Sequence, residues 1–164
     1  MLLHDARGSS GSDQGERKGH HELSAQFAAE VLAEMDWPNE KISAVQHCIR
    51  AHRFRSPPPP ETIEAQVLFD ADKLDAIGAI GAVRAIAYAV SAGQPVYAQP
   101  SETFHNTLEK EPGEAHTPYH EFLFKLSKIK ERMYTRTGKA MAEGRHNYLS
   151  DFFDQLGAEV RGER

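Results

Sequence analysis

The chain has 164 residues, 40% hydrophobic and 26% charged, so it is long enough for one domain with a hydrophobic core and is unlike a disordered or collagen-like chain. Its 19 basic and 24 acidic residues leave a net charge of −5, which argues against sequence-independent binding to nucleic-acid phosphates. The single cysteine, Cys48, excludes an internal disulfide and a cysteine-based zinc knuckle. This cysteine usage is typical of a reducing compartment, so we expect a cytoplasmic protein.

The apolar stretches do not predict a membrane or export signal. The longest of them, residues 76–92, contains Arg84 and two glycines and is too short and too polar to span a bilayer. At the N-terminus, His4 and Asp5 follow the first three residues directly, which leaves no room for the apolar core of a signal peptide. We therefore expect no membrane partner.

Two amphipathic helices are predicted in the first third of the chain. Residues 7–18 are rich in Gly, Ser and charge and predict a mobile loop. Apolar residues then recur at helical spacing over residues 19–35, and a Trp-Pro pair ends this helix. Asn39 is the predicted N-cap of a second helix, which reaches His52 before a run of prolines.

Two further helices are expected before residue 93. Thr62 opens the first, which runs to Leu74, and the second covers residues 77–92. Gly78 and Gly81 would allow close contact with another helix. Both helices are expected to be buried.

The last third of the chain predicts an irregular segment followed by two helices. Residues 93–116 contain several Gly and Pro residues and few apolar anchors. The pair Thr117-Pro118 predicts the start of a helix through about Tyr134, and Thr137 is the predicted cap of the last helix. Because no alternating strand pattern occurs, the expected fold class is all-α, a bundle of about six helices. We expect one domain, 1–164, with its core in 1–92 and C-terminal helices in 117–160.

The strongest chemical signal is an acidic cluster in LFDADKLDAIG, residues 68–78, which is otherwise apolar. Asp72 and Asp75 are three residues apart and would share one helical face, whereas Asp70 would point elsewhere. Burying a carboxylate without compensation is costly, so a bound metal would explain the cluster. The alternatives are solvent exposure or ion pairs with basic residues, namely Lys73, Arg84 or Arg145.

Histidines lie near the predicted helix ends. The pair His4-Asp5 offers an imidazole nitrogen and a carboxylate oxygen to one divalent metal, although such a pair also occurs by chance. His20 and His21 begin one helix and His52 ends the next, so an antiparallel pair of helices would bring them together.

The other candidate residues supply charge or packing. Positive charge of the kind that a phosphate substrate requires comes from Lys18, Arg50, Arg53 and Arg55. His47 and Cys48 are expected to pack in the core. The histidines without acidic or cysteine partners at ligand spacing are expected to be solvated: His105, His116, His120 and His146.

In order and spacing, the segments LLHD, HHELSAQFAAEVL, CIRAHRF and FDADKLDAIGAIGAVRAIAY resemble the HD-domain metal-dependent phosphohydrolases, most closely the small bacterial stand-alone type. The resemblance covers residues 1 to about 92, with a weaker echo over 125–153. It implies a helical bundle that binds a divalent metal. The family's first ligand, a His on a helix upstream of the His-Asp pair, has no counterpart in these residues. Two explanations stay open: the chain is a fragment of a longer protein, or the protein has lost that ligand.

The resemblance also implies roles for individual residues. The metal ligands carried over are His4, Asp5 and Asp72. The phosphate or a second metal would be bound by His21 and His52, with His20 as the competing choice. The catalytic residues would be Asp72 or Asp75, which orient a water molecule, and Lys18, which neutralises phosphoryl charge.

The function implied is hydrolysis of a phosphoester or phosphoanhydride in a small phosphorylated substrate, a nucleotide. Mixed imidazole and carboxylate ligands favour Mn²⁺, Fe²⁺, Co²⁺, Ni²⁺ or Zn²⁺, and Mg²⁺ is also compatible with them. The alternative is a truncated or degenerate HD domain that serves as a non-catalytic binding or regulatory module.

Overall fold

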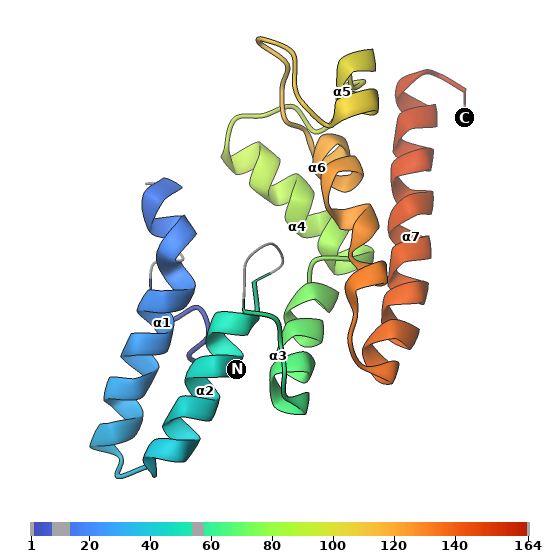
Figure 1. Ribbon diagram of the computed structural model, residues 1–164. Coiled ribbons are helices and arrows are strands. Elements are labelled where there is room, and N and C mark those ends of the chain that lie inside the picture. The colour runs from blue at the N-terminus through green and yellow to red at the C-terminus, as the bar shows by residue number, and fades with distance from the viewer. Residues whose placement is uncertain (1, 8–13, 54–57, 164) are drawn as a thin grey trace. The chain divides into compact units, whose positions relative to one another are not determined.

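The computed structural model describes residues 2–7, 14–53 and 58–163, without the side chains of 14–18. These residues form seven α-helices and two short 3₁₀ helices and contain no strand, which confirms the predicted all-α fold (Figure 1). The chain divides into two compact units, residues 1–72 and 73–164, here called the N-terminal and C-terminal units. Each is described by itself, and the single-domain arrangement stays a prediction.

In the N-terminal unit, α1 (Gln14–Glu34) and α2 (Asn39–Ala51) form an antiparallel pair (Figure 1). Two alanines of α1, Ala25 and Ala28, pack against Ile49 of α2. Because alanine is small, the two helices can approach closely there. Leu3, from the segment before α1, packs against the same core.

The ends of this pair differ in detail from the sequence prediction. Helix α1 begins at Gln14, so residues 14–18 are helical rather than part of a loop, and residues 8–13 of the predicted loop lie outside the described residues. Pro38, not Asn39, occupies the N-cap position of α2, and no side chain caps this helix. Asn39 is instead the first residue of the helix.

Helix α3 (Ile63–Leu74) begins where the sequence predicts. The hydroxyl oxygen of Thr62 accepts a hydrogen bond from the backbone N–H of Ala65, with a distance of 3.2 Å. Phe69 is buried on this helix, whereas Ile63 and Val67 are exposed. The expectation that the whole helix is buried is therefore wrong.

Helix α4 (Gly78–Ser91), in the C-terminal unit, starts with Gly78 at a φ of +77°. A Cβ atom built on Gly78 would lie 3.1 Å from Cβ of Arg145 in α7 (Arg136–Val160), so this glycine allows the predicted close helix contact. The expectation of full burial is again wrong, because the exposed apolar side chains of α4 are Ile80, Val83, Tyr88 and Val90. Within the described residues, no single helix is long and apolar enough to cross a bilayer, and α3 and α4 pass that test only when counted as one bent pair.

The segment 93–116, predicted to be irregular, contains a short helix, α5 (Glu102–Thr107). The hydroxyl of Ser101 caps it by accepting a hydrogen bond from the backbone N–H of Phe104, at 3.0 Å. Phe104 is buried and provides the apolar anchor that the composition of the segment hides.

Helix α6 (Pro118–Phe124) starts as predicted, with Thr117 as its cap and Pro118 as its first residue. The expected continuous helix to Tyr134 is wrong, because two 3₁₀ helices follow α6: η1 (Leu126–Lys128) and η2 (Lys130–Arg132). The last helix, α7 (Arg136–Val160), is capped by Thr135 rather than Thr137. The Phe122 ring of α6 stacks on Phe153 of α7 with ring centroids 4.9 Å apart.

Histidines of this unit that were expected to be solvated form hydrogen bonds instead. His120 is fully buried: its Nδ1 lies 2.7 Å from the Thr117 hydroxyl and its Nε2 lies 3.1 Å from a carboxylate oxygen of Glu114. His116 contacts Glu121, with 3.0 Å between Nε2 and Oε2. The prediction of solvation is therefore wrong for His120, because the tertiary structure places it among polar partners.

The buried His120 makes the stability of the chain depend on pH. Burial lowers its pKa below the ordinary 6.5, so the folded chain binds this proton less tightly than the unfolded chain does. Stability is therefore lost as the pH falls below about 6.5. We expect the melting temperature to fall less between pH 7 and 5 in His120→Gln than in the exposed-residue control His105→Gln. Equal decreases in the two variants would contradict this prediction.

Candidate metal centre

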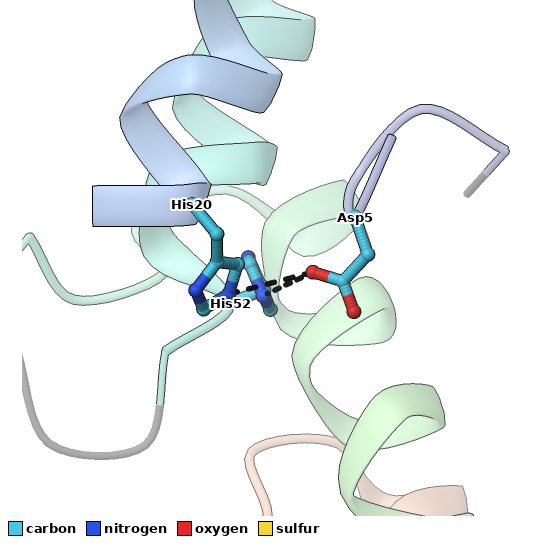
Figure 2. Close-up of side chains that lie close together, drawn as sticks. All are labelled: Asp5, His20 and His52. Carbon is cyan, nitrogen blue, oxygen red and sulfur yellow. Dashed lines mark ion pairs between the residues drawn. The ribbon is translucent and has the colours of Figure 1, made fainter. Parts of the chain in front are cut away.

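Three side chains from separate parts of the N-terminal unit converge in a cluster formed by Asp5, His20 and His52. One ligand atom of each lies within 4.8 Å of the others. Oδ1 of Asp5 is 3.4 Å from Nε2 of His20 and 3.5 Å from Nε2 of His52. Figure 2 shows the two imidazoles, from α1 and the end of α2, facing the carboxylate. Mixed imidazole and carboxylate donors at this spacing are suited to a divalent transition metal.

Two further predicted ligands lie beside the cluster. Nε2 of His4 is 3.5 Å from Oδ2 of Asp5 and 3.8 Å from Oδ1 of Asp72, on α3. The His4 ring meets the His52 ring edge to face, with centroids 5.3 Å apart. The structure thus brings together the three residues predicted as metal ligands, His4, Asp5 and Asp72, and adds two imidazoles to them.

The segment that carries His4 and Asp5 is attached to α1 through Ser24. The Ser24 hydroxyl accepts from the backbone N–H of Arg7 at 3.1 Å and lies 3.2 Å from the carbonyl oxygen of the same residue. The Arg7 guanidinium also lies over the Phe27 ring, 4.3 Å from its centroid. Ser24 is one helical turn after His20, so this attachment places Asp5 next to His20.

His21, the first choice from the sequence, has different neighbours from His20. Its Nδ1 lies 3.4 Å from Nη1 of Arg53, and its Nε2 lies 3.8 Å from Oε1 of Glu22. Burial, and then the charge of Arg53, lower the pKa of His21. The binding of phosphate or a second metal by His21 and His52, with His20 as the competing choice, stays a prediction.

The hydrogen bond at Nδ1 of His52 leaves its Nε2 facing Asp5, where a cation can bind. His52 is 3% exposed, and its Nδ1 is hydrogen bonded to the backbone carbonyl of Ile49. A carbonyl oxygen only accepts, so Nδ1 carries a proton, and when the ring has only this proton its Nε2 presents a lone pair toward Asp5. Two acceptors that face each other require a proton or a cation between them. The donor set therefore fits a metal ion.

Asp5 is the anionic member of the cluster. In the metal-free chain, a hydrogen bond from His52 when its Nε2 is protonated, together with the charge of the nearby imidazoles, lowers the pKa of Asp5 to about 2, although burial acts in the opposite direction. Its carboxylate is therefore ionised at neutral pH, and metal binding does not require it to lose a proton.

Of the other two predicted catalytic residues, the structure describes the side chain of Asp75 alone. Helix α3 ends at Leu74, so Asp75 lies in the following turn and does not share a helical face with Asp72. Asp75 is exposed and forms an ion pair with Arg84, which was the alternative to a metal for this residue. It belongs to the C-terminal unit. The side chain of Lys18 lies outside the described residues.

An apolar groove of about 710 Å³ adjoins the cluster at His4. It lies within the N-terminal unit, between residues of α1, α2 and α3, and its walls include Val31, Val45 and Val67. An organic group attached to a phosphate at the cluster would find apolar surface in this groove.

Known proteins share this sequence and fold. Residues 1–77 match the family model of the HD domain. The uncharacterized protein YpgQ of Bacillus subtilis (strain 168) is 33% identical over 127 residues, which cover 75% of this chain and 55% of YpgQ. The chain thus spans about half the length of this curated relative.

The solved structures agree with the sequence match. The selenomethionine form of B. subtilis YpgQ has a TM-score of 0.73 at 28% identity, covering 99% of this chain and 76% of that one. YpgQ has also been solved in complex with ADP, with a TM-score of 0.64 at 28% identity over 85% of this chain and 66% of that one. A Lactobacillus plantarum protein is 30% identical with a TM-score of 0.67, covering 98% of this chain and 73% of that one.

An HD-superfamily hydrolase from Bacillus thuringiensis is 28% identical with a TM-score of 0.62, covering 98% of this chain and 70% of that one. The family match includes the His-Asp pair and Asp72, the residues on which the sequence resemblance depends. The HD family binds divalent metals, and the donor set of the cluster fits such an ion. The chain therefore matches the HD-domain family over residues 1–77.

Proposed function

We propose that this protein is a metal-dependent phosphohydrolase that cleaves a phosphoester or phosphoanhydride bond of a nucleotide. The convergence of Asp5, His20 and His52 at their ligand atoms, beside His4 and Asp72, carries this proposal. The fold shared with an HD-superfamily hydrolase supports the reaction class. The complex of YpgQ with ADP supports a nucleotide as substrate.

The cluster residues would hold the metal, and the mixed donor set favours Mn²⁺, Fe²⁺, Co²⁺, Ni²⁺ or Zn²⁺ over Mg²⁺. When bound, a divalent cation lowers the pKa of water toward neutrality and polarises a phosphoryl oxygen. The Ile49 carbonyl keeps the His52 ring in the tautomer whose Nε2 lone pair faces the cluster. Asp72, half-buried and 3.8 Å from His4, would accept a hydrogen bond from water and orient it.

The apolar groove at His4 supports a substrate with an organic part as well as a phosphate. A free inorganic phosphate would leave this surface unused, whereas the base or sugar of a nucleotide would cover some of it. Lys18 remains a proposed source of positive charge for the phosphoryl oxygens.

Replacing Asp72 with Ala is expected to lower Mn²⁺-dependent phosphate release from nucleotides by at least about 100-fold, because the variant loses the group that orients water. Phosphate release is measured for the full chain, and far-UV circular dichroism shows whether the helices are retained. The matched control is Glu30→Gln, an exposed carboxylate of α1 that contacts Gln26. Unchanged turnover in Asp72→Ala would contradict the role of Asp72. A wild-type chain that binds Mn²⁺ and ADP without turnover would support the non-catalytic binding module instead.

A further inference from the structure

A strongly basic segment lies in the C-terminal unit, although the chain as a whole is acidic. Residues 125–139 hold six of the 19 basic residues and one of the 24 acidic residues, so their net charge is +5 and that of the remaining residues is −10. The six cations of this basic segment are Lys125, Lys128, Lys130, Arg132, Arg136 and Lys139. The net charge of −5 that argues against nucleic-acid binding is an average over the chain and conceals this segregation.

The fold places the two halves of the basic segment side by side. Helices η1 and η2 belong to the first half, and the second half forms the start of α7, which η2 contacts (Figure 1). Nζ of Lys130, in η2, lies 3.3 Å from Oε1 of Glu143, in α7. Arg136, Lys139 and Glu143 are spaced three and four residues apart, so they share one face of α7. The ion pair therefore brings η2 beside the face that carries Arg136 and Lys139.

Three cations of the basic segment have no anionic partner in the described chain. Lys128, Arg136 and Lys139 are exposed, and within the part of the chain that the structure describes none of them forms an ion pair. Other cations of the segment are neutralised, as Lys125 is by Glu121, with 3.3 Å between Nζ and Oε1. The three unpaired side chains therefore keep their charge for an anion from outside the chain.

Nucleic acid is the polyanion that fits this surface best. Each phosphate of its backbone carries a negative charge, and a cation that neutralises it releases a counterion, so even a few cations give measurable binding at low salt. A bilayer surface is bound most stably when apolar side chains insert as well. The aliphatic side chains of the basic segment, Leu126, Ile129 and Met133, are at most 4% exposed and are not available for insertion. A flexible single strand can adapt its backbone to cations that lie on separate elements.

We propose that the basic segment binds the phosphate backbone of single-stranded nucleic acid, independently of base sequence, through Lys128, Arg136 and Lys139. This binding function goes beyond the proposed hydrolase activity. Its residues lie in the C-terminal unit, whereas the metal cluster lies in the N-terminal unit.

The test is fluorescence anisotropy of a labelled oligothymidylate of about 20 nucleotides, longer than a typical single-strand binding site, titrated with the full chain without added metal. The logarithm of the wild-type binding constant should fall with the logarithm of the salt concentration with a slope of about −2, because each of three phosphates contributes about −0.7. The triple variant Lys128→Ala, Arg136→Ala, Lys139→Ala should bind about 30-fold more weakly at low salt, since an exposed charge contact contributes about threefold. Its salt slope should be close to zero.

The matched control removes three cations from outside the basic segment. Lys41, Arg84 and Lys110 are exposed and lie in α2, in α4 and after α5. Replacing all three with Ala gives the same net charge as the triple variant of the basic segment, and this control should bind the oligonucleotide as the wild type does. Melting temperatures show whether both triple variants fold. The single variant Lys128→Ala, which leaves α7 intact, should bind about threefold more weakly than the wild type.

The inference is overturned if the wild type does not bind the oligonucleotide at low salt, if the control loses as much affinity as the triple variant, or if Lys128→Ala and the triple variant bind like the wild type. Binding to phosphatidylserine vesicles without binding to the oligonucleotide would also overturn it and make the surface a lipid site. The triple variant should keep wild-type Mn²⁺ affinity. Failure of the hydrolase proposal is therefore observed separately, in the metal titration and the phosphate-release assay.

Discussion

Replacing Asp5 with Ala is expected to weaken Mn²⁺ binding by more than about 100-fold, since even residues that only orient metal ligands contribute about 10- to 100-fold to affinity. One carboxylate oxygen of Asp5 faces His20 and His52, and the other faces His4. Asp5 therefore contacts all three of these imidazoles. Its pKa of about 2 keeps it ionised at neutral pH. Without it, the three imidazoles would lose the carboxylate that faces all of them, and Asp72, which lies beside His4, would be the remaining negative charge.

The measurement is a calorimetric Mn²⁺ titration of the metal-stripped chain. Asp5→Asn keeps one oxygen without the charge, so its affinity should lie between that of the wild type and that of Asp5→Ala. Glu30→Gln, which removes an exposed carboxylate from α1, should bind Mn²⁺ normally. If Asp5→Ala retained stoichiometric binding at wild-type affinity, the metal would have to bind elsewhere and the cluster would lose its proposed role.

The second large effect is expected on stability, from Gly81→Ala in α4. A Cβ atom at this position would lie 2.5 Å from the carbonyl carbon of Ala76, and closer still to its oxygen. Those atoms belong to the backbone of the turn before α4, which cannot move aside as a flexible side chain can. We expect the free energy of unfolding to fall by about 1–3 kcal/mol, as is typical when extra atoms are forced into a packed interior.

Gly144→Ala is the matched control because Gly144 also lies inside a helix, α7, and a Cβ there would meet nothing within 4 Å. Replacing a helical glycine by alanine without a clash stabilises the helix by about 0.5–1 kcal/mol. Urea unfolding of both variants should therefore give shifts of opposite sign. A stabilised Gly81→Ala would show that the turn at Ala76 can move without cost.

The sequence predicted most helices because the signals for them are local. Apolar spacing indicated α1 and α2, and Thr62 and Thr117 marked the starts of α3 and α6. The sequence predictions are wrong where a contact distant in the sequence decides the local structure. Helix α5 depends on the burial of a single phenylalanine, Phe104, and the composition around it hides that anchor.

The buried His120 shows the same limit. Its hydrogen-bond partners lie only three and six residues away, but the polar sequence around it does not indicate that it is excluded from solvent while His105 is exposed. Glu114 and Thr117 supply its two hydrogen-bond partners, and the fold around them excludes solvent. Burial of a polar residue among satisfied partners is a property of the tertiary structure.

For the candidate site, the sequence alone determined the residue types: the His-Asp pair, histidines at two helix ends and an aspartate on α3, which together match a family of metal-binding domains. Only the tertiary structure decided which of them meet. The bonds between Ser24 and Arg7 place Asp5 beside His20. Arg145 of α7 donates to the carbonyl of Leu74, where α3 ends, and Asp75 lies in the turn that follows. That contact spans 71 positions of the chain, and helical periodicity, which relates residues three or four apart, carries no information about it.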